Sequence, residues 1–202
     1  MRLLIRVVVF VAVLLVGLVG IGFLLSDQVH VERRVEIAAP PAALYAVLNS
    51  FDKFEQWSPW AGLDPAMKVE ISGPPAGVGA RYAWHGNAEV GSGSQEIIAT
   101  TPDRSVTLKL VFDGFEHPST TVYSIEPKGE GSVVSWSMDA DLGHDPVMRY
   151  VGLVMKKEIE VDYDKGLARL KTLAEALPAP SGDAAAPAAE PAAAPSPEGA
   201  GY

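Results

Sequence analysis

The sequence predicts an α+β domain in which a curved antiparallel sheet of about seven strands wraps around one long C-terminal helix. Two observations lead to this prediction. Residues 146–177 have the apolar spacing of a single long helix. Between residues 31 and 140, short segments of alternating apolar and polar residues are separated by turn residues, which is typical of antiparallel strands. A helix with a long apolar stripe needs an extended apolar partner, and we expect the sheet to be that partner.

The N-terminus contains an uncharged run, residues 7–25, that follows Arg2 and Arg6. As a helix, with a rise of about 1.5 Å per residue, this run would cover roughly 28 Å, close to the hydrocarbon thickness of a bilayer. The alternative is a cleaved signal peptide, whose apolar core is usually about 7–15 residues and ends at a small-x-small site. Residues 26–30 offer no such site. We therefore predict a transmembrane anchor over residues 1–27.

The basic residues around this helix bear on its orientation. Arg2 and Arg6 favour a cytoplasmic N-terminus under the positive-inside rule. Arg33 and Arg34 favour the opposite orientation, but they lie further from the helix. We expect a single-pass protein of the cytoplasmic (inner) membrane whose domain lies on the outer, periplasmic side.

The domain is expected over residues 28–177 and begins with a strand over residues 31–37. Its apolar face also carries Arg33, which lies either near the open end of the strand or in a buried pair with an anion. Two short helices are predicted next, over residues 42–48 and 51–56.

Six further strands follow, at residues 67–71, 81–85, 91–101, 106–112, 120–125 and 133–140. The glycine-rich segment 73–79 is a turn, because the helix and lysine that a phosphate-binding loop needs do not follow it. The last strand has a predicted inner face of Val134, Trp136, Met138 and Ala140, and an outer face of Ser135, Ser137 and Asp139.

The long helix has clear start and stop signals. Asp145 is a predicted N-cap, Pro146 lies in the first turn, and Pro178 ends the helix. Its second half has one apolar stripe: Tyr163, Leu167, Leu170, Ala174 and Leu177. Its first half has a broader apolar face: Val147, Val151, Val154, Met155 and Ile159. The alanine- and proline-rich segment 178–202 cannot form a core and is predicted to be disordered.

Several short motifs now support a resemblance. The segment 35–40, leading into 44–48, is similar to the opening of the SRPBCC superfamily, which includes START-related and polyketide cyclase/dehydrase-like proteins. The other motifs that carry the resemblance are Trp57 to Trp60, Asp64, Gly73, Gly77, Gly79, Trp84, Gly86, Gly91, Gly93, Ile98, Pro102, Trp136 to Met138 and Gly166 to Lys171. Together they resemble the polyketide cyclase/dehydrase-like branch, which has the helix-grip fold.

The resemblance implies a deep apolar cavity between the sheet and the long helix. Members of the superfamily bind lipids, polyketides, sterols or other hydrophobic molecules there. A few members are enzymes, and a few are protein-interaction modules. The fold therefore does not decide the function.

Composition excludes several functions. The net charge is −9 and basic residues are not clustered, so nucleic acid is not an expected partner. The chain has no cysteine, which excludes disulfides and thiolate catalysis. The four histidines are scattered, and no catalytic residues, metal ligands or cofactor are predicted. Carboxylates at 158, 160, 162 and 164 are interpreted as a solvated helix face.

The candidate ligand-binding residues are the aromatic and apolar residues expected to face inward, together with one cation. They are Trp84, Phe112, Tyr123, Trp136, Met138, Tyr150, Met155 and Arg33. The candidate polar contacts for a ligand are Tyr82, Tyr123 and Arg33. Trp57 and Trp60 are expected near the cavity mouth, where they either gate entry or cap the core.

Three hypotheses follow. The first is a membrane-anchored domain that binds a hydrophobic small molecule or lipid beside the membrane. The second is a cyclase- or dehydratase-type enzyme, which needs an ionisable group with a perturbed pKa inside the cavity. The third is a protein-interaction module at the membrane, for which the sequence identifies no partner and which a contiguous exposed apolar patch would favour.

Overall fold

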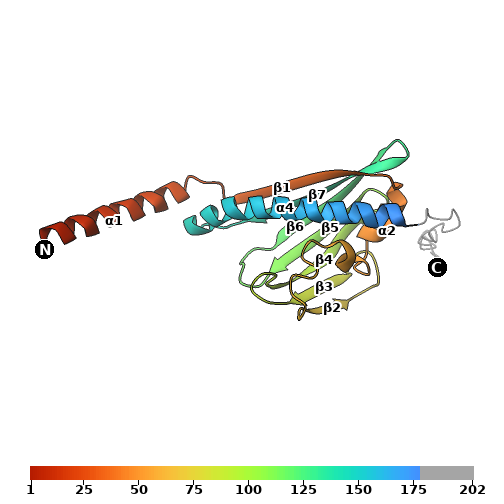
Figure 1. Cartoon of the computed structure of the whole chain (residues 1–202), viewed down its shortest axis with the longest axis horizontal. Coiled ribbons are helices and arrows are strands. Elements are labelled where there is room, and N and C mark those ends of the chain that lie inside the picture. The colour runs from red at the N-terminus through yellow and green to blue at the C-terminus, as the bar shows by residue number, and fades with distance from the viewer. Residues whose placement is uncertain (178–202) are drawn as a thin grey trace, which may run out of the picture.

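In the computed structural model, which describes residues 1–177, seven strands form one antiparallel sheet and a long helix crosses its concave face (Figure 1). The predicted disordered tail, residues 178–202, lies outside the described residues. The elements in chain order are α1 (Arg2–Gly22), β1 (Gln28–Ile37), α2 (Pro41–Leu48), α3 (Phe54–Trp57), β2 (Lys68–Ser72), β3 (Arg81–His85), β4 (Ser92–Thr101), β5 (Ser105–Phe112), β6 (Ser119–Lys128), β7 (Gly131–Asp141) and α4 (Pro146–Ala176). The predicted fold is confirmed.

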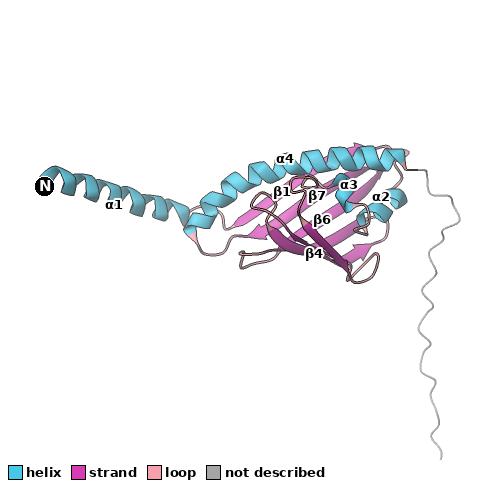
Figure 2. Ribbon diagram, turned by 60° about the horizontal axis from the view of Figure 1, so that its bottom comes forward, coloured by secondary structure: helices cyan, strands magenta, loops and turns pink. Residues whose placement is uncertain are grey.

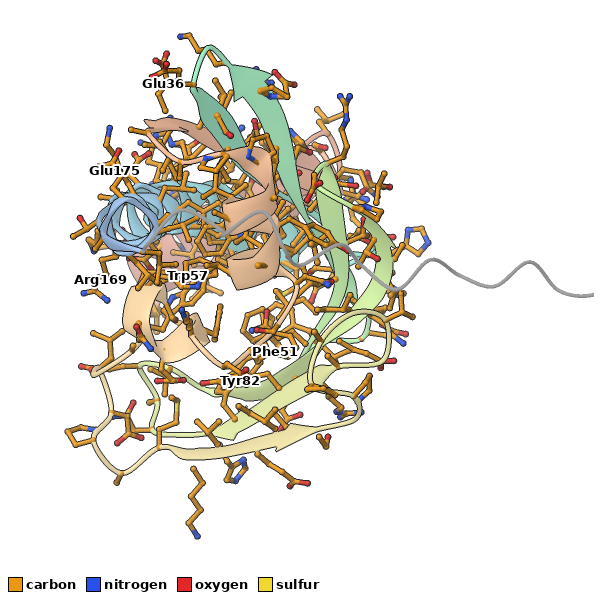
Figure 3. The ribbon with its side chains drawn as sticks, turned by 90° about the vertical axis from the view of Figure 1, so that its right-hand side faces the viewer. Glu36, Phe51, Trp57, Tyr82, Arg169 and Glu175 are labelled. Carbon is orange, nitrogen blue, oxygen red and sulfur yellow. The ribbon has the colours of Figure 1, made fainter. Side chains whose placement is uncertain are left out.

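The sheet has the strand order β1-β7-β6-β5-β4-β3-β2, and every neighbouring pair is antiparallel. The six strands β2 to β7 are consecutive neighbours, and β1 adds beside β7. The register of β4 against β5 shifts between Ile97 and Ala99, and such irregularities bend a strand. Seen along α4, the sheet curves around the helix (Figure 3).

Helix α4 begins at the predicted cap. The Asp145 carboxylate accepts a hydrogen bond from the Val147 backbone N–H at 2.8 Å, and Pro146 occupies the first turn. Tyr163, Leu167, Leu170 and Ala174 are all buried, as the apolar spacing predicts. The helix is continuous and gently curved (Figure 2).

The first half of α4 departs from the prediction. Met155 and Ile159 are partly buried on the sheet side, but Val147, Val151 and Val154 are exposed. A Cβ at Gly152 would meet Leu142 and Val29, so the Gly152 side of the helix faces the domain. The three valines lie on the opposite side because of the 3.6-residue period. The sheet therefore covers only part of the apolar surface of α4.

Two strands also differ in burial from the simple alternation. Ser135, expected to face water, is buried, because β7 lies between β1 and β6 and Ser135 is paired with Arg34 and Ser124 on either side. By contrast, every residue of β2 is exposed, including Val69 and Ile71. β2 is an edge strand whose only neighbour is β3.

Helix α1 extends away from the domain (Figure 2). It has 21 residues and is long and apolar enough to cross a membrane. All residues of α1 except Gly22 are exposed. Gly22 lies against Pro146 and Tyr150, so the end of α1 packs on the start of α4.

Candidate functional site

A cavity of about 220 Å³ lies between the inner face of the sheet and α4. Strands β3 to β7 supply one wall. Met155, Ile159 and Tyr163 of α4 supply the other, and Phe54, Ser58 and Trp60 close one side. The space under the helix is therefore not filled by side chains.

The cavity has a closed end and an open end. Its buried lining residues are Phe54, Ser58, Tyr82, Gln95, Ser119, Thr121, Tyr123, Trp136, Met138 and Tyr163. Its exposed lining residues are Glu89, Phe115, His117 and Asp141, which belong to the β3–β4 loop, the β5–β6 loop and the end of β7. These exposed residues mark the mouth.

Trp136 is the centre of the aromatic packing at the closed end. Its ring stacks on Tyr163 with centroids 3.8 Å apart and an angle of 14° between the planes. Trp57, Trp60 and Tyr123 pack on the same indole, with centroid distances of 5.4, 5.9 and 5.4 Å. Aromatic pairs of this kind contribute beyond their buried area. The closed end is therefore a wall of packed aromatic rings.

Tyr82 is the centre of a second cluster. Its ring packs on Phe51, Phe54 and Trp84, with centroid distances between 5.0 and 6.2 Å (Figure 3). Its hydroxyl donates a hydrogen bond to the Glu55 carboxylate, which is exposed on α3. Burial, together with this carboxylate, raises the pKa of Tyr82. Tyr82 therefore keeps its proton and joins α3 to the sheet.

The interior of the cavity is neutral. Burial raises the pKa of Tyr123 and of Tyr163, so both hydroxyls stay protonated. Within residues 1–177, no lysine or arginine lines the cavity, and the carboxylates and the histidine of its lining, Glu89, Asp141 and His117, lie at the mouth. The walls thus provide no countercharge for a buried anion.

Several polar groups in the wall are nevertheless free to bind a ligand. Thr121 Oγ1 and Trp136 Nε1 are buried and make no hydrogen bond within the described residues. The Tyr163 hydroxyl lies near both atoms, but the geometry of neither contact is that of a hydrogen bond. A buried polar atom without a partner costs about 1–3 kcal/mol. These atoms suit a ligand with a polar group.

Most of the predicted ligand-binding residues lie together. Six of the eight line the cavity: Trp84, Phe112, Tyr123, Trp136, Met138 and Met155. Trp60, expected at the mouth, also lines it and packs against Trp136 at the closed end. Trp57 does not. It is 2% exposed and packs edge-on against Phe54 and Trp136, so it caps the core and does not lie at the mouth. The mouth is at the opposite side of the lining, near Phe115 and His117.

Arg33 and Tyr150 lie outside the cavity lining. The Arg33 guanidinium, on the side of β1 that faces α4, lies 3.6 Å from the Glu160 carboxylate and 3.4 Å from that of Asp164. These two carboxylates therefore pair with Arg33, although the sequence suggested that they only face solvent. Tyr150, in the first turns of α4, contacts α1, and its hydroxyl donates to the Leu18 carbonyl at 2.7 Å.

Sequence reasoning missed some lining residues. Gln95 lies two residues before the buried Ile97 on β4, so alternation along that strand was the available signal. Thr121 has the same relation to Tyr123 on β6. Phe115 and His117 come from the β5–β6 loop, for which no periodicity exists. Within residues 1–177, no cluster of three metal-ligating side chains occurs.

Comparison with known families identifies the domain. The family model for "polyketide cyclase / dehydrase and lipid transport" matches residues 28–175, which include the whole sheet and nearly all of α4. The chain belongs to this family. No curated protein matches the chain significantly.

Several solved structures of other proteins have the same fold as this member of the polyketide cyclase / dehydrase and lipid transport family. Truncated norcoclaurine synthase from Thalictrum flavum has a TM-score of 0.58 at 14% identity, covering 72% of this chain and 92% of its own. The Aha1 dimer from Colwellia psychrerythraea has a TM-score of 0.53 at 18% identity, covering 73% and 97%. The di-domain aromatase/cyclase StfQ of the steffimycin pathway has a TM-score of 0.57 at 14% identity, covering 73% and 51%. At these identities the likeness shows the fold alone.

Proposed function

We propose that this family member is a membrane-tethered domain that binds a neutral, mainly apolar small molecule or lipid in the cavity under α4. The observation that carries the proposal is the combination of an open cavity with a neutral, aromatic wall. Ligand pockets of proteins have this character, with a few polar groups that fix orientation. Thr121 and Gln95 are the candidates for those groups.

The charge of the ligand follows from the wall. An ionised carboxylate or phosphate buried without a partner is very unfavourable, because it loses its hydration. The interior contains only neutral tyrosines, amides and hydroxyls besides its apolar groups. An anionic group would therefore remain at the mouth, near His117, while the neutral part of the ligand enters.

The size of the cavity limits what is enclosed. An engineered apolar cavity of about 150 Å³ holds benzene. The present cavity, at about 220 Å³, is larger, so it suits one or two rings or a segment of a longer chain. A larger ligand would extend through the mouth.

The tether is α1. Its length and hydropathy suit a bilayer span, and Arg2 and Arg6 favour a cytoplasmic N-terminus. In this orientation the domain lies on the outer side of the cytoplasmic membrane. A tethered domain meets ligands dissolved in the bilayer at a high effective concentration.

Two dyes of nearly the same shape test the proposal. N-phenyl-1-naphthylamine is neutral and has three aromatic rings, so part of it would extend through the mouth. 8-Anilinonaphthalene-1-sulfonate has the same rings and carries an additional sulfonate. Titrating both into residues 28–177 should give saturable fluorescence enhancement with the neutral dye and at least tenfold weaker binding of the sulfonate. Equal binding, or no saturable binding of the neutral dye, contradicts the proposal.

A matched pair of variants locates the site of dye binding. Ser119 is small, buried and part of the lining, whereas Thr120 follows it on the same strand and is exposed. Ser119→Leu should fill part of the cavity and weaken binding of the neutral dye. Thr120→Leu adds similar apolar volume outside the cavity and should leave binding unchanged. Equal effects would place the dye elsewhere.

A cyclase- or dehydratase-type enzyme is the second candidate. The observation in its favour is that three tyrosines with raised pKa line the cavity and can donate protons or hydrogen bonds: Tyr82, Tyr123 and Tyr163. Against it, the buried lining within residues 1–177 has no carboxylate, histidine or lysine to act as a base. Mass spectrometry of a ligand recovered from the protein after prolonged incubation separates the two functions, because an enzyme would return it chemically changed.

A further inference from the structure

The exposed apolar side of α4 is the starting observation. Val147, Val151 and Val154 are 60%, 39% and 65% exposed. Their spacing of four and three residues puts them in one stripe along the first turns of the helix. Within residues 1–177 no other element covers this stripe. Such a patch on a folded domain indicates an interaction surface.

The junction between α1 and α4 fixes where this stripe lies. The Tyr150 hydroxyl donates to the Leu18 carbonyl at 2.7 Å. Arg149 Nη1 donates to the carbonyls of Phe23 and Leu25, at 3.0 Å each. The first turn of α4 therefore contacts the C-terminal end of α1, and the two helices meet end to end (Figure 1).

Glycine makes this junction close. A Cβ on Gly22 would come within 2.8 Å of Pro146 Cβ and 3.0 Å of the Tyr150 ring. Arg149 is mostly buried, with a side chain only 10% exposed, and its guanidinium also lies 3.9 Å from the Asp27 carboxylate. Five residues of α1 and its linker (Leu18, Gly22, Phe23, Leu25 and Asp27) are thus in contact with the start of α4.

The depth of the stripe follows from the length of α1. The helical part of its uncharged run, residues 7–22, covers roughly 24 Å, so the run reaches across the hydrocarbon only if residues 23–25 also lie within it or at its edge. Side chains that pack beside Leu18 and Phe23 are then at the boundary from which the chain leaves the bilayer. Tyrosine and arginine are common at this level. Lys156 and Lys157, one turn after the stripe, suit the headgroup region.

The mouth of the cavity lies on the same part of the domain. Met155 follows Val154 directly and lines the cavity, and Leu142 lines it while contacting the Gly152 position on α4. A surface that rests on the bilayer here brings the mouth close to the membrane. A neutral hydrophobic ligand would then have a short path through water.

We propose that Val147, Val151 and Val154 form a bilayer-docking surface that holds the domain against the outer leaflet beside α1. The occupant of the surface is lipid. This inference rests on the proposed function, because it requires α1 to span the membrane.

Site-specific fluorescence tests the proposal on the full chain. The protein has no cysteine, so a single cysteine can be labelled with an environment-sensitive probe without removing any other. The positions are V151C and V154C at the stripe, V13C within α1, and T172C as an exposed control near the far end of α4. Each protein is reconstituted into vesicles of phosphatidylcholine and phosphatidylglycerol, with and without nitroxide-labelled lipid.

The proposal expects strong quenching by the nitroxide lipid at positions 151, 154 and 13, and little at position 172. Quenching at 13 but not at 151 or 154 overturns the docking surface and leaves the anchor intact; a protein partner would then be the occupant of the stripe. Absence of quenching at 13 overturns the anchor, and the docking surface with it.

A second variant separates docking from folding. Val151→Asp and Val154→Asp together place two charges on the stripe, and the domain should keep its thermal unfolding midpoint because both positions are exposed. With these changes, a probe at V147C should lose at least half of its quenching. Unchanged quenching at 147 contradicts docking through this face.

Discussion

The Trp136 indole on β7 stacks on the Tyr163 ring on α4, with 3.8 Å between their centroids. This one contact joins β7, the strand beside the edge strand β1, to the helix that the sheet surrounds. It also forms the wall of the cavity, because both rings are among its lining residues. Stability of the fold and the shape of the site therefore depend on the same pair.

Removing the Tyr163 ring should lower the unfolding free energy much more than removing its hydroxyl alone. Tyr163→Ala removes a buried aromatic side chain, for which about 3–5 kcal/mol of unfolding free energy is typical. Tyr163→Phe keeps the stacked ring and should change the unfolding free energy by less than about 1.5 kcal/mol. Urea denaturation of residues 28–177, followed by tryptophan fluorescence, measures both. Equal losses would mean that the hydroxyl and not the stack holds the helix.

Gly166 controls how closely α4 approaches this pair. A Cβ there would lie 2.8 Å from Trp136 Cζ3 and 3.0 Å from Pro59 Cδ. Gly166→Ala gains roughly 1 kcal/mol of helix propensity, but the clash in a packed wall costs about 1–3 kcal/mol. We expect net destabilisation or displacement of the indole, seen as a shift in its near-ultraviolet circular dichroism.

The exposed Ala168 provides the control for helix propensity. Ala168→Gly should destabilise by roughly 1 kcal/mol through propensity alone, and should leave the tryptophan signal unchanged. If Gly166→Ala instead stabilises the protein by the amount that Ala168→Gly loses, the close approach of α4 has no energetic cost.

The sequence predicted the fold well because its patterns concern burial in regular elements. The stripe Tyr163 to Ala174 and the alternation of Trp136 and Met138 both arise from side chains that must leave water, so periodicity locates them. The cap at Asp145 is equally local. These features need no knowledge of distant contacts.

What the sequence did not predict is which side of a helix or strand another element covers. Val147 and Val151 have the same apolar character as the core valines, and their exposure depends on which side of α4 the sheet covers. Arg33 was placed on the inner face correctly, but its pairing with Glu160 and Asp164 depends on where α4 crosses β1. Trp57 was expected either to gate the mouth or to cap the core, and only its packing against Trp136 on β7 shows that it caps the core.

Alkaline pH should unfold the domain through its buried tyrosines. Burial raises the pKa of Tyr123 and Tyr163 in the folded state, whereas an unfolded tyrosine loses its proton near about pH 10. Below that pH both states are protonated and stability does not change. Above it the unfolded state binds fewer protons, so each tyrosine lowers the unfolding free energy by up to about 1.4 kcal/mol per pH unit.

Tyrosinate absorbance and circular dichroism, followed together in a pH titration, check this. The rise in absorbance from these tyrosines and the loss of circular dichroism should occur over the same pH range. Tyr123→Phe should make stability fall less steeply with increasing pH. Ionisation of all tyrosines while the domain keeps its circular dichroism would contradict the assignment.

Arg149 should control the position of α1 relative to the domain. Arg149→Met keeps much of the apolar stem but loses the hydrogen bonds to the Phe23 and Leu25 carbonyls. We expect amide hydrogen exchange in residues 23–28 to accelerate at least tenfold in the full chain in nanodiscs. Lys157→Met removes an exposed cation from the same helix and should leave this exchange unchanged. Equal exchange in both variants would show that Gly22 packing alone holds the junction.

Thr121 should show opposite effects on stability and on binding. Its Oγ1 is buried without a hydrogen-bond partner in the described part of the chain, and it lines the cavity. Thr121→Val replaces the hydroxyl with a methyl group of similar size, which removes an unpaired polar atom and should raise the unfolding free energy of the ligand-free domain by about 1 kcal/mol. The same change should weaken a ligand that hydrogen-bonds there by about fivefold or more, because its polar group would be left unpaired. Denaturation and dye titration on the same preparation measure both. A variant that is less stable and binds equally would show that the hydroxyl serves the fold and not the ligand.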